Sequence, residues 1–367
     1  MSSSYDVIVV GAGAVGAACA RELAHAGRRV LMLDPGRIEG AAWSASAGML
    51  APQIEAGRDD PLFELGLAGR AIYRDLAPAL KSATGIDIGF WQEGIARVAL
   101  DEVEAGELRS KVAWQRQGGH RCDWLDAAEV HSRWPWLRPT FGALWAPNEG
   151  AVNAAALVEA LRADAIGRGA RLEQDTVTAL ERDGDRVTGV RGTGHYSADA
   201  VIIAAGAWSG RIDGLPRPLS VEPLRGQAVA LEWPAGVPGA VVYSRDCYVV
   251  HRGNEAIVGA TREYAGFRTD TVPADIHRLA DAARALSPAF AALQIRRAWA
   301  GLRPATPDGL PIIGREPHAR GLWYAAGHGR NGVLLAPITG VLIRQLLAGE
   351  ETLEQLDAMR PERFWSC

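Results

Sequence analysis

The feature that most constrains the fold lies at the start of the chain, in the stretch YDVIVVGAGAVGAACARELAHAG. The apolar run over residues 5–10 predicts a buried parallel strand, and residues 14–26 predict a helix that stops at Gly27. The next apolar run, residues 28–34, predicts a second strand. Strand, helix and strand in this order form the βαβ unit of dinucleotide-binding folds.

Three glycines at G-x-G-x-x-G spacing join the first strand to the helix. Glycine supplies 42 of the 367 residues, so this spacing is expected by chance about 0.5 times, and its context gives it weight. Gly11 permits the tight turn, Gly13 lets the backbone approach a pyrophosphate, and Gly16 lets helix and strand pack closely. Asp34, at the end of the second strand, is placed for a ribose hydroxyl and would repel a 2′-phosphate. NAD and FAD therefore remain open, and NADP is disfavoured.

The same spacing recurs at Gly327, Gly329 and Gly332 in WYAAGHGRNGVLLAP. This second loop follows a short strand and opens an apolar helix over residues 333–347, so it also presents backbone N–H groups at a helix N-terminus. No return strand with a terminal acid follows. We therefore expect this loop to serve another purpose than a second dinucleotide fingerprint.

The rest of the chain predicts a mixed α/β fold with a discontinuous nucleotide domain and an inserted domain. A chain of 367 residues suggests two domains, and the stretch 219–300 alternates as an antiparallel sheet does. The stretch VIIAAGAWSG predicts another buried strand that enters a glycine turn near the dinucleotide. The predicted nucleotide domain comprises residues 1–80, 141–218 and 300–367, and the substrate domain comprises residues 81–140 and 219–299.

Composition excludes several other classes of protein. The formal charge is −4 and no basic cluster is interleaved with aromatic residues, so a nucleic-acid surface is not expected. The cysteines, at 19, 122, 247 and 367, form no CxxC pair, which favours reduced thiols in a cytoplasmic protein without a metal site. We find no signal peptide and no uncharged apolar run of membrane-spanning length, so no membrane span is expected.

Five motifs in order resemble one enzyme family. GAGAVG with Asp34, SASAGMLAP, VIIAAGAWS, WAGLRPATPDGLPIIG and AAGHGRNGVLLAPITG are similar to the D-amino-acid-oxidase-like FAD amine oxidases, and most of all to the glycine oxidases of thiamine biosynthesis. The resemblance implies a Rossmann-like FAD domain of the GR2 type and a substrate domain built on a large antiparallel sheet. It also implies a homo-oligomer. FAD should be bound without a covalent link, because LRPATPDGLP lacks the cysteine that tethers flavin in the sarcosine-oxidase relatives.

The motifs and the resemblance together predict the residues that contact FAD. They are Gly11, Gly13, Ala14, Val15, Gly16, Asp34, Pro35, Trp43, Ser44, Ala47, Gly48, Met49, Val177, Ala205, Gly206, Trp208, Gly301, Arg303, Gly327, His328, Gly329, Arg330, Asn331, Gly332 and Val333. In the family the second glycine loop wraps the isoalloxazine ring, and a valine in the strand after the mid-chain helix meets the adenine, which here matches Val177. His328 is expected to contact flavin through its backbone rather than to act as an acid or base.

The resemblance also predicts how the substrate is held. Arg303 should bind the substrate carboxylate through two parallel hydrogen bonds, with Arg330 and Tyr248 beside it, and Met49 and Ala51 should line the same pocket. Two residues depart from the family pattern: Arg262 replaces an uncharged residue and Asp246 replaces a histidine. Arg262 is therefore a candidate for binding a second anionic group. No general base is needed for hydride transfer from a neutral amine.

The expected reaction is oxidation of glycine or a small N-substituted glycine by hydride transfer from Cα to flavin, giving an imine and, with O2 as acceptor, hydrogen peroxide. Three alternatives stay open. The first is a D-amino-acid dehydrogenase that uses another electron acceptor. The second is an oxidase specific for N-carboxymethyl amines such as iminodiacetate. The third is a flavin-binding protein without activity.

Overall fold

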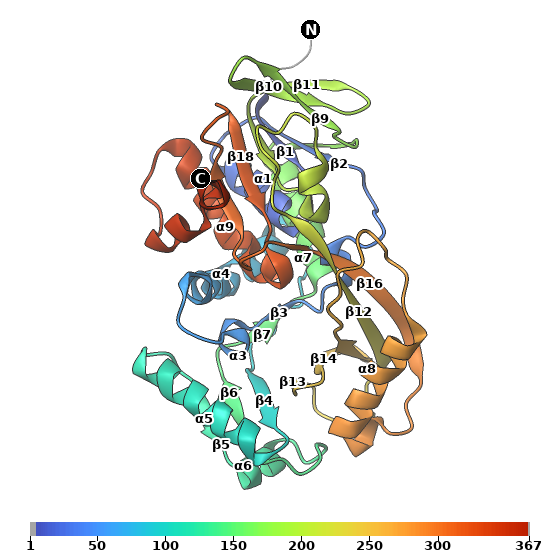
Figure 1. Cartoon of the computed structure of the whole chain (residues 1–367). Helices are drawn as coiled ribbons and strands as arrows, with labels where there is room; N and C mark the ends of the chain where they lie inside the picture. The colour runs from blue at the N-terminus through green and yellow to red at the C-terminus, as the bar shows by residue number, and fades with distance from the viewer. Residues whose placement is uncertain (1–4, 366–367) are drawn as a thin grey trace.

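The computed structural model of the chain describes residues 5–365 and contains two eight-stranded sheets (Figure 1). The first sheet has the order β17-β18-β11-β1-β2-β8, and β10 and β9 extend it from β11. Its strands are β1 (Tyr5–Val10), β2 (Val30–Asp34), β8 (Arg171–Gln174), β9 (Ala179–Asp183), β10 (Arg186–Arg191), β11 (His195–Ile203), β17 (Ile312–Arg315) and β18 (Leu322–Ala326). The mixed α/β class predicted from the sequence is confirmed.

The centre of the first sheet is parallel and buried on both faces, as the continuous apolar runs of the sequence predict. Val10 pairs with Ile203 of β11 and with Leu33 of β2, so the carboxyl ends of three strands meet at one edge. Helices α1 (Ala14–His25), α7 (Ala154–Gly167) and α9 (Gly332–Ala348) pack beside these strands. A Cβ atom at Gly340 of α9 would lie 2.7 Å from Ala18 O, so glycine permits this close contact with α1.

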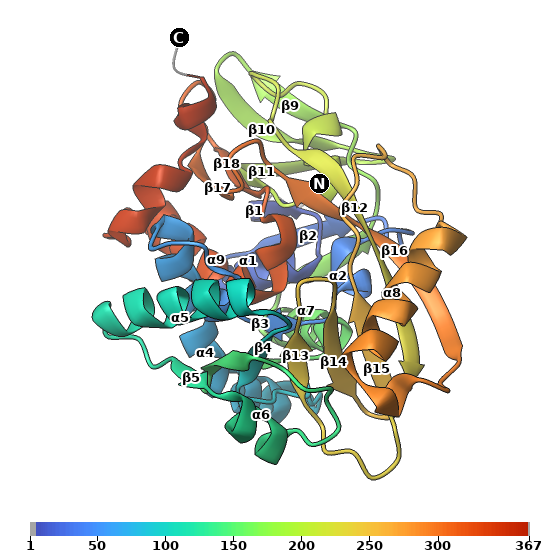
Figure 2. The same ribbon diagram turned by 60° about the horizontal axis from the view of Figure 1, so that its bottom comes forward.

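The second sheet is antiparallel except between β13 and β4, and its order is β16-β12-β15-β14-β13-β4-β6-β5. Its strands are β4 (Ile95–Ala99), β5 (Asp123–Leu125), β6 (Gly142–Ala146), β12 (Glu222–Glu232), β13 (Val241–Tyr243), β14 (Tyr248–Arg252), β15 (Glu255–Gly259) and β16 (Ile295–Ala305). Helices α6 (Ala127–Arg133) and α8 (Pro273–Leu286) pack on one face. Alternation turns the other face toward α5 (Glu102–Gln117) and toward the first sheet (Figure 2).

A segment of short elements lies between the two sheets. It comprises α2 (Ala42–Ala45), β3 (Met49–Leu50), which pairs with β7 (Gly150–Ala151), and α3 (Pro52–Glu55), and it leads into α4 (Pro61–Thr84). The long strands β12 and β16 extend from beside the first sheet, past this segment, out along the second sheet (Figure 1). The division of the chain into two domains at the predicted boundaries stays a prediction.

Several local expectations can be compared with the structure. The hairpin predicted around Asp183 and Gly184 is β9–β10. Val177 lies in the loop between β8 and β9 and not within a strand, because β8 ends at Gln174. Cys19, Cys122 and Cys247 are free and buried, and Cys367 lies outside the described residues.

One helix is apolar over a long stretch, although Arg330 and Arg344 interrupt it. Gly329–Ala348 is long and apolar enough to span a membrane by length and composition alone. Packing explains this composition, because 56% of that window is buried inside the protein, where α9 contacts α1 and α4.

Candidate active site

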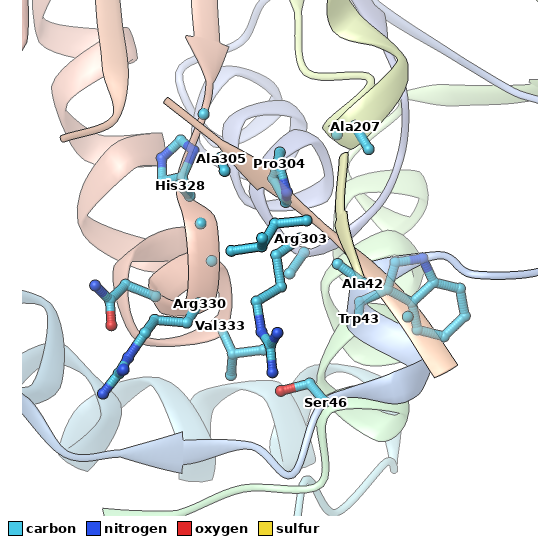
Figure 3. Close-up of a pocket in the computed structure, with 18 of the residues that line it drawn as sticks. Ala42, Trp43, Ser46, Ala207, Arg303, Pro304, Ala305, His328, Arg330 and Val333 are labelled. Carbon is cyan, nitrogen blue, oxygen red and sulfur yellow. The ribbon is translucent and has the colours of Figure 1, made fainter. Parts of the chain in front are cut away.

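A cavity of about 1430 Å³ lies where the two sheets meet, and both glycine loops line it. The residues predicted to contact FAD or substrate line this cavity, with two exceptions, Gly16 and Ser44. Figure 3 shows the part of it where Arg303, Arg330, His328 and Val333 surround a common space. Residues as far apart in sequence as Val10 and Leu334 are thus assembled by the fold around one volume.

The first glycine loop is folded as its motif predicts. Gly11 has φ of +93°, and a Cβ atom there would lie 2.5 Å from Ala204 O. A Cβ atom at Gly16 would lie 1.9 Å from Gly11 O, so Gly16 stands behind the loop and permits its packing rather than lining the cavity. The Asp34 carboxylate accepts hydrogen bonds from the N–H groups of Ala12 (2.7 Å) and Gly36 (2.9 Å). These bonds fix the acid at the cavity wall with lone pairs left for a ribose hydroxyl.

The helices that follow the two glycine loops differ from most long helices of the chain at their N-termini. Helices α4, α5, α6 and α7 are capped by the side chains of Asp60, Asp101, Asp126 and Asn153. Helices α1 and α9 begin at the cavity and have no side-chain cap. Their first N–H groups are therefore available to a ligand with negative charge, such as a pyrophosphate or a carbonyl edge of a flavin.

The loops also leave room for a large, flat ligand. A Cβ atom at Gly206 or at Gly329 would meet no atom within 4 Å, and both glycines line the cavity. With the uncapped ends of α1 and α9 and the acid at position 34, the residues present fit an FAD molecule that extends from one glycine loop to the other. Within residues 5–365 no group of three His, Cys, Asp or Glu side chains could hold a metal ion.

The segment before α3 contributes one wall of the cavity. Trp43, Ala47, Gly48 and Met49, which are predicted to contact FAD, line it. A Cβ atom at Gly48, whose φ is +72°, would lie 1.9 Å from Val152 O, so this turn requires glycine. The hydroxyl of Ser44 is instead bonded to Ala41 O at 2.9 Å, and the residue is exposed.

The serine that does reach the cavity is two positions later than predicted. Ser46 lines the cavity at the end of the Arg303 side chain (Figure 3). Ser44 lies within the short helix α2 and its hydroxyl turns back to Ala41, whereas Ser46 follows the end of this helix at Ala45. Ser46 is therefore the better candidate of the two for contact with a ligand.

Arg303 lies on β16, and its guanidinium points into the cavity (Figure 3). Nη1 donates to Thr261 O at 3.1 Å. A Cβ atom at Gly226 would lie 2.2 Å from the same Nη1, so glycine on the neighbouring strand leaves space for the flat guanidinium. Burial lowers the pKa of Arg303. Arg303 has no carboxylate partner among the described residues, and a bound carboxylate would supply one.

Arg330 follows the second glycine loop and is held by an acid that sequence reasoning missed. Its Nε lies 2.6 Å from Glu55 Oε2, and the hydroxyl of Tyr243 donates to Glu55 Oε1 at 2.9 Å. The negative charge of Glu55 raises the pKa of Arg330. The Arg330 side chain remains 53% exposed, so it can reach a ligand in the cavity while Glu55 fixes its position.

Tyr248 lies beside this pair, with its ring centroid 5.7 Å from that of Tyr243. A Cβ atom at Gly259 would lie 2.3 Å from the Tyr248 hydroxyl, so the ring packs over glycine backbone. Burial raises the pKa of both tyrosines. Both hydroxyls therefore stay protonated; that of Tyr243 already donates to Glu55, and that of Tyr248 can donate to a bound carboxylate.

Two further arginines line the cavity. Arg97, also missed by sequence reasoning, lies on β4 at the register position of Tyr243, and Arg262 is exposed at the cavity wall, as is Asp246. Neither arginine makes an ion pair in the part of the chain that the structure describes. A sequence signal for Arg97 exists, because it is the one charged residue in the apolar strand IARVA.

His328 is buried, and its Nε2 lies 3.0 Å from Thr339 Oγ1 of α9. Burial lowers the pKa of His328 to about 3, so the imidazole is neutral near pH 7. The first loop has a neighbour that was not predicted: Arg162 of α7 donates from Nε to Ala12 O at 2.6 Å, and its Nη2 lies 3.5 Å from Asp34 Oδ2.

Comparison with known proteins agrees with this site. Residues 6–346 match the family described as DAO, FAD dependent oxidoreductase. The chain is 37% identical to a glycine oxidase of Geobacillus kaustophilus, over 96% of this chain and 95% of that one. The crystal structure of glycine oxidase from Geobacillus kaustophilus superposes with a TM-score of 0.93 at 36% identity and covers 98% of this chain and 99% of that one.

Two other relatives bear on substrate and context. The crystal structure of iminodiacetate oxidase from Chelativorans sp. BNC1 matches with a TM-score of 0.88 and 27% identity, over 97% of this chain and 98% of that one. A bifunctional protein ThiO/ThiG of Trichormus variabilis is 34% identical, over 98% of this chain but 55% of its own length. The family match, the fold and the cavity agree: the chain belongs to the DAO family of FAD-dependent oxidoreductases and is an FAD-dependent amine oxidase.

Proposed function

We propose that this enzyme oxidises glycine, or a small N-substituted glycine, to the corresponding imine. The observation that carries the proposal is the Arg303 guanidinium, which is partly buried, has no ion-pair partner within residues 5–365 and is directed into the cavity that both glycine loops line. The relatives named glycine oxidase and iminodiacetate oxidase support this substrate class.

The side chains at the inner end of the cavity would orient the substrate. Arg303 binds the carboxylate with two parallel hydrogen bonds, and Arg330 and Tyr248 supply further donors beside it. This anchoring fixes the Cα atom relative to the cavity wall that α9 and its glycine loop form. FAD, when bound along the two glycine loops, supplies the two-electron acceptor for the hydride that leaves Cα.

A general base is not required, and the cavity does not offer an obvious one. The substrate amine must be neutral so that its lone pair assists the departure of hydride. His328 is neutral but bonded to Thr339, and Glu55 is bonded to Arg330 and Tyr243. The titration that controls the rate at moderate pH is therefore expected to be that of the substrate amine.

The test is oxidation of glycine by the purified holoenzyme under air. We expect one glyoxylate, one ammonium and one hydrogen peroxide for each O2 consumed, because the imine hydrolyses in water. Turnover without peroxide would instead indicate the dehydrogenase alternative, in which a different acceptor takes the electrons. Absence of turnover with every small amine would refute the proposal.

A second candidate function is oxidation of N-carboxymethyl amines, which carry two carboxylates. Arg97, Arg262 and Arg303 face the same cavity, and none of the three has an ion-pair partner in the described part of the chain. A monocarboxylate neutralises one of these charges and a dicarboxylate neutralises two. Arg262→Met should raise KM for iminodiacetate and leave KM for glycine unchanged. Equal effects on both substrates would remove Arg262 from this role.

The chain spans about half the length of the bifunctional relative ThiO/ThiG. In that relative, a part similar to this chain and a second activity share one polypeptide. We propose that the imine formed here is likewise used in thiamine biosynthesis. A cytoplasmic location, non-covalent FAD and a homo-oligomeric assembly complete the proposal. Size-exclusion chromatography with light scattering measures the last of these directly.

A further inference from the structure

The turn α3, which carries Glu55, is held from behind by buried polar side chains. The Glu149 carboxylate accepts from the N–H groups of Gln53 and Ile54. The Lys111 ammonium donates to Ile54 O at 2.6 Å, and Gln115 Nε2 donates to Gln53 O at 2.9 Å. Side chains from outside α3 therefore form hydrogen bonds with the peptide N–H and C=O groups at its centre.

The side chain of Gln53 extends this network in two directions. Its Oε1 accepts from Arg70 Nη1 at 2.6 Å, and its Nε2 donates to Gln115 Oε1 and to Arg121 O, each at 3.0 Å. Arg70 also lies 4.0 Å from the Glu149 carboxylate, which is fully buried. The network thus joins α4, α5 and the loop before β7 to the back of α3.

The front of the same turn faces the cavity. Ala51 and Glu55 line it, and Glu55 accepts from both Arg330 and Tyr243. A turn of only four residues moves as a unit, so a shift at Ile54 is transmitted to Glu55. The position of the Arg330 guanidinium therefore depends on contacts made on the far side of α3.

Position 111 carries a lysine in a chain whose other long cationic side chains are nearly all arginine, which indicates that a compact cation is needed there. Lys81 and Lys111 are the only lysines in the chain, and all other cationic side chains of this length are arginine. Lys81 pairs with Asp87 at the surface, whereas Lys111 is partly buried. A compact ammonium fits against one carbonyl, while a broad guanidinium carries more donors than that site can satisfy.

Holding Lys111 and Glu149 in their charged forms at these buried positions lowers the free energy of unfolding. Burial lowers the pKa of Lys111 to about 8, with the charge of Arg97 acting in the same direction and those of Glu149 and Glu55 opposing it. Burial raises the pKa of Glu149 to about 8, although Arg70 opposes this. Buried charged groups are weak contributors to folding free energy, which favours a role in geometry instead.

We propose that Lys111 and Glu149 are positioning residues that fix α3 and, through Glu55, fix the Arg330 guanidinium at the substrate carboxylate. This inference rests on the proposed function for the identity of the substrate. Neither residue lines the cavity, so both act at a distance from the reacting atoms.

The test compares Lys111→Met with Lys81→Met, the same substitution at the other lysine, in FAD-loaded enzyme. Lys111→Met should raise both KM for glycine and Kd for glycolate about tenfold, because the hydrogen bond between the Arg330 guanidinium and the bound carboxylate is weakened. The value of kcat should change less than about twofold. Glycolate binding is read from the flavin spectrum and needs no turnover. Lys81→Met should leave both constants unchanged.

A double-mutant cycle with Glu55→Gln shows whether the effect passes through Glu55. In that background Lys111→Met should add less than about twofold to Kd for glycolate. An equal effect in both backgrounds, or a lowered Tm with unchanged KM and Kd, would overturn the proposal.

Two further outcomes separate the inference from the proposed function. A wild-type enzyme that binds glycolate but oxidises no amine would refute the proposed function alone, and the glycolate measurements would still decide on Lys111. A wild type that binds no glycolate would overturn both. If Lys111→Met does not fold, Lys111→Gln should raise Kd for glycolate about threefold, since its shorter donor only partly replaces the ammonium.

Discussion

Replacement of Arg303 by methionine is the substitution for which the structure gives the clearest expectation. The guanidinium already donates to Thr261 O, and its remaining donors face the cavity. Two charge-assisted hydrogen bonds to a carboxylate, at about 1.5–3 kcal/mol each, imply a loss of about 3–6 kcal/mol on truncation. This corresponds to a fall in kcat/KM of about 10²- to 10⁴-fold. Arg303→Lys, which keeps one bond, should lie between the wild type and Arg303→Met.

Stability should respond in the opposite sense. Burial lowers the pKa of Arg303, so the charge is disfavoured by the fold, and no carboxylate within residues 5–365 compensates it. Methionine fills a similar volume without that cost, so Tm in the absence of substrate should stay equal or rise. Arg303 thus belongs to the residues where function opposes stability.

The assay is steady-state peroxide formation with glycine, alongside thermal unfolding of the FAD-loaded enzyme. The matched control is Arg296→Met on the same strand, where Arg296 is exposed and pairs with Glu232 at 3.0 Å. Retention of kcat/KM within about tenfold of the control by Arg303→Met would contradict this expectation. So would a fall in Tm as large as a core truncation causes, which is about 4–8 °C per kcal/mol in small domains and less in a chain of this size.

Three other predictions follow from the site. Gly16→Ala places a Cβ atom 1.9 Å from Gly11 O, so the loop must move, and FAD affinity measured by flavin fluorescence should fall more than about tenfold. The control is Gly27→Ala, whose Cβ atom meets no atom within 4 Å, and this variant should retain FAD affinity despite the φ of +76° at Gly27. Burial lowers the pKa of His328 to about 3 from an ordinary 6.5, so the unfolded chain binds the proton at a higher pH than the folded protein does. The contribution of His328 to the free energy of unfolding is therefore complete above about pH 6.5 and is lost as the pH falls toward 3. His328→Gln should therefore flatten the fall of Tm over this range and leave the pH profile of kcat/KM unchanged; a shifted profile would give the imidazole a role in proton transfer. Acid precipitation should release yellow cofactor into the supernatant, and a yellow pellet would show a covalent link.

The sequence was most informative where local backbone geometry is decisive. The roles of Gly11 and Gly16 follow from their spacing within a strand–helix–strand context, and the structure places atoms within 2.5 Å of where their Cβ atoms would be. Arg303 and Arg330 were identified by the motifs around them, and both line the cavity. Such motifs report short-range constraints, which a linear sequence preserves.

The partners of those residues were not predictable in the same way. Glu55 bonds to Arg330 across 275 positions, and no periodic pattern links the two. Tyr243 and Arg97 could have been found from strand alternation, because they lie on the same sheet face as Tyr248. The sequence predicts Ser44 at the cavity in place of Ser46, because the four-residue helix that contains Ser44 is too short to give a periodic pattern.

The central claim is that FAD extends between the two glycine loops and that a carboxylate-bearing amine is held beside it by Arg303. Anaerobic addition of glycine, sarcosine, iminodiacetate or D-alanine to the purified holoenzyme tests it most directly. We expect glycine or an N-substituted glycine to bleach the flavin of the wild type, and we expect Arg303→Met to stay yellow at the same concentration. A colourless protein that takes up no FAD, or a flavin that none of the four amines reduces, would contradict it.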